Sequence, residues 1–185
     1  MPVRRKHIRS LVEQLLAAQG VRSAAVDVEL IATALGVQIH NEVAADNLSG
    51  FLIRDVESKR AMIGVNSTHS AARKRFTIAH EIAHFLLHEG DVLHVDQREG
   101  VDLGLRMKRR DPGSSLGIDD EEKEANLFAA ELLMPTSFLE TDLLEMKASA
   151  PQDEDEDIVE ALAKRYDVSI QAMTFRLTNL GLLHL

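Results

Sequence analysis

Apolar residues recur at helical spacing near the start of the chain. Between positions 4 and 19 they follow an i, i+3, i+4, i+7, i+8 pattern: Ile8, Leu11, Val12, Leu15 and Leu16. This pattern predicts an amphipathic helix that ends at Gly20. A second short helix is predicted over 28–35, because Asp27 is a good N-cap residue and Gly36 follows its end.

The next part of the chain has the pattern of short β-strands. Three runs rich in β-branched and other apolar residues occupy 37–43, 50–54 and 61–66. Turn-forming residues separate these runs, with Asp46 in the first gap and 55–59 forming the second. The simplest topology is an antiparallel meander, in which 61–66 is an edge strand able to pair with an extended substrate.

The segment 75–88 is apolar on nearly all sides, which predicts a buried helix that is capped within 67–70. Polar residues interrupt it in the order H-E-x-x-H: His80, Glu81 and His84. Burying such side chains is costly unless they are paired or bind a metal. Residues at i and i+4 share one helix face, so both imidazoles can bind one ion. An ordinary solvated helix face is the alternative interpretation of the same three residues.

The spacing of these residues is typical of a metal-dependent peptidase. The 185-residue chain contains no cysteine, so zinc has only histidine and carboxylate ligands, which favours a catalytic over a structural site. Glu81 follows the first ligand and is predicted to act as the general base and then the general acid. The same ligand set accepts Mn²⁺ or Fe²⁺, so the sequence leaves the metal open between these ions and Zn²⁺.

His88 lies one helical turn beyond His84. On a straight helix, residues eight apart are separated by about 12 Å, so His80, His84 and His88 cannot all bind one ion. We therefore expect His88 to contact one of the metal-binding residues, or the end of the helix, rather than the metal itself.

Residues 91–117 lose regular periodicity and are rich in glycine, proline, serine and mixed charge. This composition predicts a long loop, and loops of such length are often functional. Its basic residues are either solvated surface or a site for acidic substrate or a developing oxyanion: Arg106, Lys108, Arg109 and Arg110.

A helix is predicted over 119–134, and its apolar stripe consists of Ala125, Phe128, Ala129, Leu132 and Leu133. The two alanines of this stripe permit close packing on another helix. Glu121 and Glu122 both border this stripe, and spacing favours Glu122 only modestly as the third metal ligand. Glu124 lies further round the helix. Asn126, one turn after Glu122, is placed to accept a hydrogen bond from a ligand histidine. An acidic first turn favoured by the helix dipole is the alternative reading of these glutamates.

The C-terminal part of the chain is predicted to be helical. Ser137 and Glu140 form a capping box for a helix through 146. Two further short helices, joined at 167–169, resemble a helix-turn-helix pair. The second helix offers only Arg176 as a basic residue, so packing or partner docking is favoured over base reading.

Three units are predicted along the chain: a metallopeptidase domain over 1–146, an acidic linker over 147–157 and a C-terminal helical element over 158–185. The formal net charge of −9 argues against nucleic acid as the main partner. The first twenty residues lack the apolar core of a signal peptide, and no stretch approaches the length of a membrane span. The expected location is the cytoplasm, with no membrane partner.

Two long motifs carry a resemblance to a known family. The stretch R-F-T-I-A-H-E-I-A-H-F-L-L-H at 75–88, followed by E-K-E-A-N-L-F-A-A-E-L-L-M-P at 122–135, resembles the ImmA/IrrE family of zinc metallopeptidases. Residues 26–37 and 63–66 are also similar to that family, so the resemblance covers about 26–140.

The resemblance implies an α+β, zincin-like fold, with a small antiparallel sheet on the active-site helix, additional helices and a C-terminal helical element. It implies zinc bound by His80 and His84 together with Glu122, the glutamate three positions before the Ala-Asn pair. Characterised members cleave, or promote cleavage of, helix-turn-helix repressors of the Xre type, which implies a transcriptional repressor as the protein substrate.

These observations predict a zinc-dependent endopeptidase that hydrolyses a peptide bond in a protein substrate. The alternative function is a non-catalytic metal-binding regulator, acting by protein–protein interaction or DNA binding through the C-terminal helices. An open three-ligand site with Glu81 beside it favours the peptidase, because structural zinc usually has four protein ligands.

Overall fold

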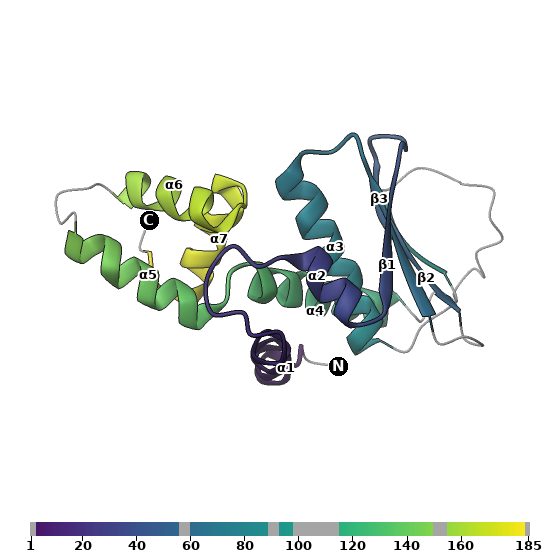
Figure 1. Ribbon diagram of the computed structural model, residues 1–185, viewed down its shortest axis with the longest axis horizontal. Coiled ribbons are helices and arrows are strands. Elements are labelled where there is room, and N and C mark those ends of the chain that lie inside the picture. The colour runs from purple at the N-terminus through teal and green to yellow at the C-terminus, as the bar shows by residue number, and fades with distance from the viewer. Residues whose placement is uncertain (1–2, 56–59, 89–92, 98–114, 150–154, 184–185) are drawn as a thin grey trace.

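The computed structural model describes residues 3–55, 60–88, 93–97, 115–149 and 155–183 (Figure 1). The elements follow in the order α1 (Arg5–Ala18), α2 (Val28–Ala34), β1 (Val37–Glu42), β2 (Leu48–Asp55), β3 (Arg60–Asn66), α3 (Ala71–Leu87), β4 (Leu93–Gln97), α4 (Ser115–Leu133), α5 (Thr136–Ser149), α6 (Asp155–Tyr166) and α7 (Ile170–Leu180). The predicted α+β class is confirmed. None of the helices in these ranges is long and apolar enough to cross a membrane.

The described strands form a mixed sheet in the order β1-β3-β2-β4. β2 is antiparallel to both β3 and β4, whereas β1 pairs with β3 in parallel. The predicted antiparallel meander is therefore wrong, and β3 is a central strand rather than an edge. β1 and β2 run in opposite directions, as do β2 and β3, but β3 inserts between β1 and β2 and therefore pairs with β1 in parallel.

Asn66, at the end of β3, hydrogen-bonds the backbone of the connection between β1 and β2. Its side-chain nitrogen donates to the carbonyls of Ala44, Ala45 and Leu48, at 3.2, 3.0 and 3.0 Å. The side chain is 2% exposed, and its oxygen accepts from the Thr68 backbone N–H at 3.1 Å. One buried side-chain amide thus provides a hydrogen-bond donor for three backbone carbonyls, two within the β1–β2 connection and that of Leu48 at the start of β2.

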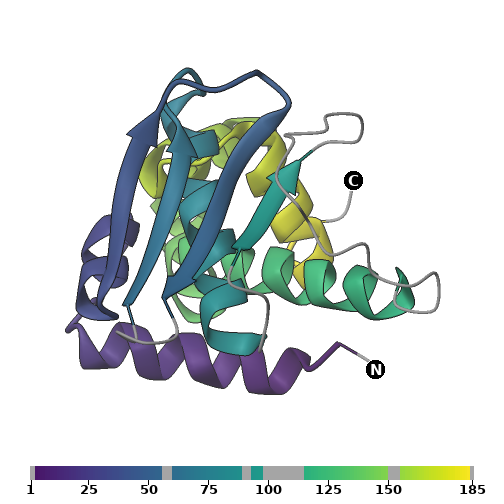
Figure 2. The ribbon, with the colours of Figure 1, turned by 90° about the vertical axis from the view of Figure 1, so that its right-hand side faces the viewer.

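α3, which carries the H-E-x-x-H sequence, packs on β2 and β3, and α4 packs on α3. Figure 2 shows the sheet in front of these helices, with α1 running across one end. A Cβ at Gly50 would lie 2.5 Å from Thr77 Cγ2 and 2.7 Å from the Gly64 carbonyl oxygen. Only glycine permits this close approach of helix and sheet. Ser70 caps α3, as predicted, by accepting from the Arg73 backbone N–H.

Part of the predicted long loop is regular structure. β4 lies within it, and α4 begins at Ser115, several residues before the predicted start. β4 is short and flanked by glycines and charges, so its five residues carry too little periodicity to be recognised. The four basic residues of the predicted patch, at 106 and 108–110, lie outside the described residues.

Polar contacts join the C-terminal helices to the rest of the protein. The Arg75 side chain on α3 donates to the backbone carbonyl of Asp167, at the predicted α6–α7 turn, at 3.2 Å. α5 begins at Thr136, and Glu131 of α4 accepts from its backbone N–H at 3.0 Å. The N-cap position is therefore Pro135, and the predicted capping box of Ser137 and Glu140 is misplaced by two residues. The division into three units at 146 and 158 remains a prediction.

Candidate metal centre

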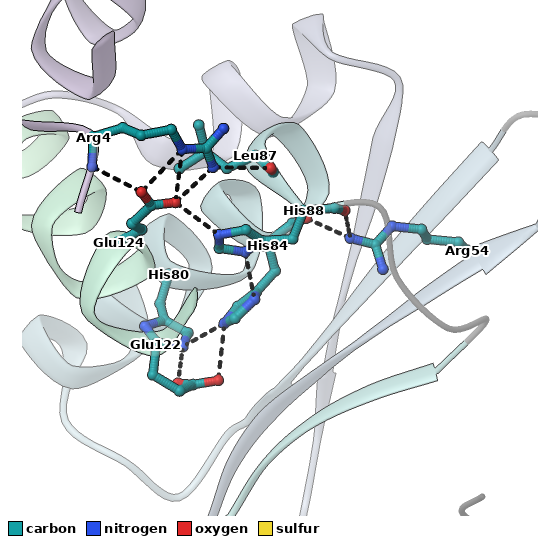
Figure 3. A network of polar contacts seen from close by, with 8 residues as sticks. All are labelled: Arg4, Arg54, His80, His84, Leu87, His88, Glu122 and Glu124. Atoms are coloured by element: carbon teal, nitrogen blue, oxygen red, sulfur yellow. Dashed lines mark hydrogen bonds and ion pairs between the residues drawn. The ribbon is translucent and has the colours of Figure 1, made fainter. Parts of the chain in front are cut away.

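Two helices bring together the predicted metal-binding side chains. α3 supplies His80 and His84, and α4 supplies Glu122 (Figure 3). The two histidine Nε2 atoms lie 3.0 Å apart. The Glu122 carboxylate lies 3.3 Å from His80 Nε2 and 3.4 Å from His84 Nε2. The two carboxylate oxygens face different imidazoles, Oε2 facing His80 and Oε1 facing His84, so the three side chains form a compact triangle able to hold one ion.

The dimensions of this triangle fit a tetrahedral ion. Ligand atoms about 2.0–2.1 Å from zinc, at tetrahedral angles, are about 3.3 Å from one another. The three separations, two of which involve different oxygens of Glu122, lie within a few tenths of an ångström of that value. Of the two candidate carboxylates, Glu122 belongs to this described cluster and Glu121 does not. The residues present therefore fit a metal with three protein ligands.

Burial and hydrogen bonding favour the protonation states that a metal site needs. His80 and His84 are 3% and 2% exposed. Burial lowers the pKa of His84, and the hydrogen bond to Glu122 only partly offsets this. Burial raises the pKa of Glu122, but the interactions of its carboxylate with His80 and His84 outweigh this, so the pKa lies well below its usual range. A neutral imidazole beside an anionic carboxylate is the state in which both bind metal.

Asn126 makes the contact expected from its spacing. Its Oδ1 lies 3.2 Å from His80 Nδ1. An amide oxygen only accepts hydrogen bonds, so His80 Nδ1 donates, and a neutral His80 then carries its lone pair on Nε2. That nitrogen is the one that faces Glu122. The contact thus selects the tautomer in which Nε2 is available to a metal.

Glu81 and His88 complete the set of predicted residues. Glu81 follows His80 on α3 and is fully buried, at 0% exposure. His88 is the C-cap of α3, where its backbone is extended rather than helical. Its Nδ1 lies 3.1 Å from His84 Nδ1, the nitrogen of His84 that faces away from Glu122. The Arg54 guanidinium, from β2, donates to the carbonyls of both His84 and His88 and so ties this helix end to the sheet.

Two residues near the site escaped the sequence reasoning. Glu124 and Arg4 form an ion pair at 2.6 Å, and Glu124 also lies 3.3 Å from His88 Nε2. The helical pattern places Glu124 further round α4 than the two glutamates that border the apolar stripe, so it does not indicate a contact with the site. Arg4 is 120 residues away in the chain, and no local pattern connects such a pair.

The cluster borders a cleft of about 590 Å³. His80, Glu122 and Asn126 line one side, and Arg73 and Phe76 extend the lining along α3. The opposite side comes from the α6–α7 turn and the start of α7: Val168, Ser169, Gln171 and Ala172. The C-terminal helical element is therefore part of the cleft wall.

The sheet, the two facing helices and their His–His–Glu cluster define a zincin-like α+β domain. The sequence profile described as the IrrE N-terminal-like domain, of peptidase family M78, matches residues 32–178. The chain therefore belongs to this metallopeptidase family, as its two long motifs predicted.

Solved structures agree with this assignment at the level of the fold. A Mycobacterium tuberculosis transcriptional regulator superposes with a TM-score of 0.57 at 15% sequence identity. The match covers 93% of the present chain and 47% of the other, so the chain spans about half of that protein's length. A search of curated proteins finds no match.

Proposed function

We propose that the protein is a zinc-dependent endopeptidase. The observation that carries this proposal is the cluster of two imidazole nitrogens and one carboxylate, with separations of 3.0 to 3.4 Å, beside a cleft of about 590 Å³. His80, His84 and Glu122 hold the metal, and three protein ligands leave one position for water or substrate. Four protein ligands would instead indicate a structural site.

Each polar residue of the site has a proposed part in peptide hydrolysis. When bound, zinc acts as a Lewis acid that lowers the pKa of water and polarises the scissile carbonyl. The Glu81 carboxylate accepts a proton from the attacking water and passes it to the leaving nitrogen. The Asn126 oxygen keeps the proton of His80 on Nδ1, so that Nε2 remains a ligand.

The proposed substrate is a protein of the Xre repressor type. Two observations support a protein substrate of this kind: membership of the family whose motifs the chain carries, and a structural neighbour that is itself a transcriptional regulator. The cleft of about 590 Å³ beside the cluster is lined by residues of α3, α4 and α7, and we propose that it receives an extended segment of the substrate.

Metal content and cleavage together test this proposal. We expect one zinc per chain, lost in Glu122→Ala and retained in the matched control Glu121→Ala. We expect wild-type protein to cut a purified Xre-type repressor, and Glu81→Gln to keep its zinc but lose most of the cleavage. Full cleavage by Glu81→Gln with unchanged zinc would refute the catalytic role of Glu81. A wild-type protein that binds no metal would refute the site.

A protein-binding regulator is the second candidate function. α7 exposes two large apolar side chains, Ile170 at 54% and Phe175 at 62%. Its one predicted DNA-reading residue, Arg176, is only 5% exposed and forms an ion pair with Glu131. These features favour contact with protein over contact with DNA. If this candidate is correct, Glu81→Gln retains the full regulatory effect and Phe175→Ser loses it.

A further inference from the structure

A chain of contacts leads from the N-terminal segment to one of the proposed metal ligands. The backbone N–H of Arg4 donates to Glu124 Oε1 at 2.8 Å, and its Nε and Nη2 donate to the same carboxylate at 2.9 and 2.6 Å. Glu124 Oε2 lies 3.3 Å from His88 Nε2, and His88 Nδ1 lies 3.1 Å from His84 Nδ1 (Figure 3). Each link lies within hydrogen-bond distance.

The direction of each hydrogen bond follows from the first acceptor. Arg4 donates to Glu124 from its backbone N–H and from a permanently charged guanidinium, so this carboxylate is the ionised partner of an ion pair and only accepts. His88 Nε2 must therefore donate to it. A neutral imidazole that donates from Nε2 accepts at Nδ1, so His84 Nδ1 donates to His88. His84 Nε2 is then the unprotonated nitrogen, and this is the atom that lies beside His80 and Glu122.

The geometry of this relay is also restrained. The side chains of Glu124 and His88 are 7% and 6% exposed, so neither has room to change rotamer freely. Arg4 binds the carboxylate with its backbone and its guanidinium together, which leaves Glu124 one orientation. His84 is thereby held at its outer nitrogen, as Asn126 holds His80.

We propose that Glu124, fixed by Arg4, is a positioning residue for the metal centre that acts on His84 through His88. This inference rests on the proposed metal site. It adds that docking of the N-terminal segment of α1 sets the metal affinity. Carboxylate and imidazole partners of metal ligands typically contribute 10- to 100-fold to affinity, so this is the scale of effect expected from Glu124.

The test measures the dissociation constant for Zn²⁺ by chelator competition at pH 7. We expect Glu124→Ala to weaken zinc binding by about 10- to 100-fold. Glu131→Ala is the matched control, because Glu131 is also a buried glutamate of α4 in an ion pair with an arginine but contacts none of the histidines described here. It should destabilise the fold and leave zinc affinity unchanged. Arg4→Ala should weaken zinc binding less than Glu124→Ala, and Arg5→Ala, its exposed neighbour, should not.

A spectroscopic readout separates positioning from general damage. In Co²⁺-substituted protein, the visible ligand-field bands report the geometry of the ligands. We expect these bands to change in Glu124→Ala and to match wild type in Glu131→Ala. Equal zinc affinity and identical bands in Glu124→Ala and wild type would overturn the inference while leaving the metal site intact. Absence of metal binding by wild type would overturn the proposed function itself.

Discussion

Replacing Arg176 by methionine tests how the C-terminal helices are held on the domain. The guanidinium lies 2.5 Å from Glu131 Oε2, and its Nε and Nη2 donate to the Met134 carbonyl at 3.0 and 2.9 Å. Methionine preserves most of the side-chain volume but removes the charge. Glu131, at 3% exposure, would then be a buried carboxylate without its arginine, and the Met134 carbonyl would lose both donors.

The expected cost is large because both partners are buried. Breaking a buried ion pair by removing one partner costs about 3–5 kcal/mol. For a chain of this length each kcal/mol lowers the melting temperature by about 2–4 °C, so we expect a decrease of about 6–20 °C. Urea denaturation of the metal-free protein gives the unfolding free energy directly.

Two further variants make this prediction specific. Arg9→Met removes a cation that lies 3.9 Å from the same glutamate but is about half exposed, so it should cost at most about 1 kcal/mol. Adding Glu131→Gln to Arg176→Met removes the stranded charge and keeps an acceptor for Thr136, so it should recover part of the loss. A loss in Arg176→Met no larger than that in Arg9→Met would refute the argument.

Two other substitutions test the helix–sheet packing and the histidine tautomer. Gly50→Ala should cost about 1–3 kcal/mol of unfolding free energy, because its Cβ would meet the Gly64 carbonyl oxygen and Thr77; a denaturation midpoint equal to wild type contradicts this. Asn126→Ala should weaken zinc binding by about 10- to 100-fold in the same chelator competition, since His80 Nδ1 loses its acceptor; unchanged affinity would show that this contact does not orient His80.

The sequence predicted features that depend on neighbours within one or two helical turns. Asp27 caps α2 as expected, with its side chain accepting from two backbone N–H groups. His80 and His84 meet because i and i+4 share a helix face, and Asn126 was found by the same spacing rule. The type of secondary structure, helix caps such as Asp27 and the side chains that share one helix face can therefore be predicted from local patterns.

Features that depend on distant pairs could not be predicted in this way. Asn66 hydrogen-bonds the β1–β2 connection some twenty residues earlier, and nothing in the local sequence around an asparagine indicates such a partner. Arg176 had the pattern of an exposed cation on a recognition helix, yet its partner Glu131 lies 45 residues away. In each case the polar residue is visible in the sequence, but the local pattern does not show which distant residue it contacts.

α4 explains why these distant contacts affect one site. Glu122 and Glu124 are two residues apart, so they leave the helix about 200° apart: one faces His80 and His84, the other Arg4. Glu131, seven residues after Glu124, returns to nearly the same face, where it contacts Arg9 of α1 and Arg176 of α7. A single helix thus carries a proposed ligand, the anchor of the N-terminal segment and the anchor of the C-terminal element. The N-terminal segment is attached to this helix at Glu124, beside the site, whereas the C-terminal element is attached at Glu131, about two turns further on.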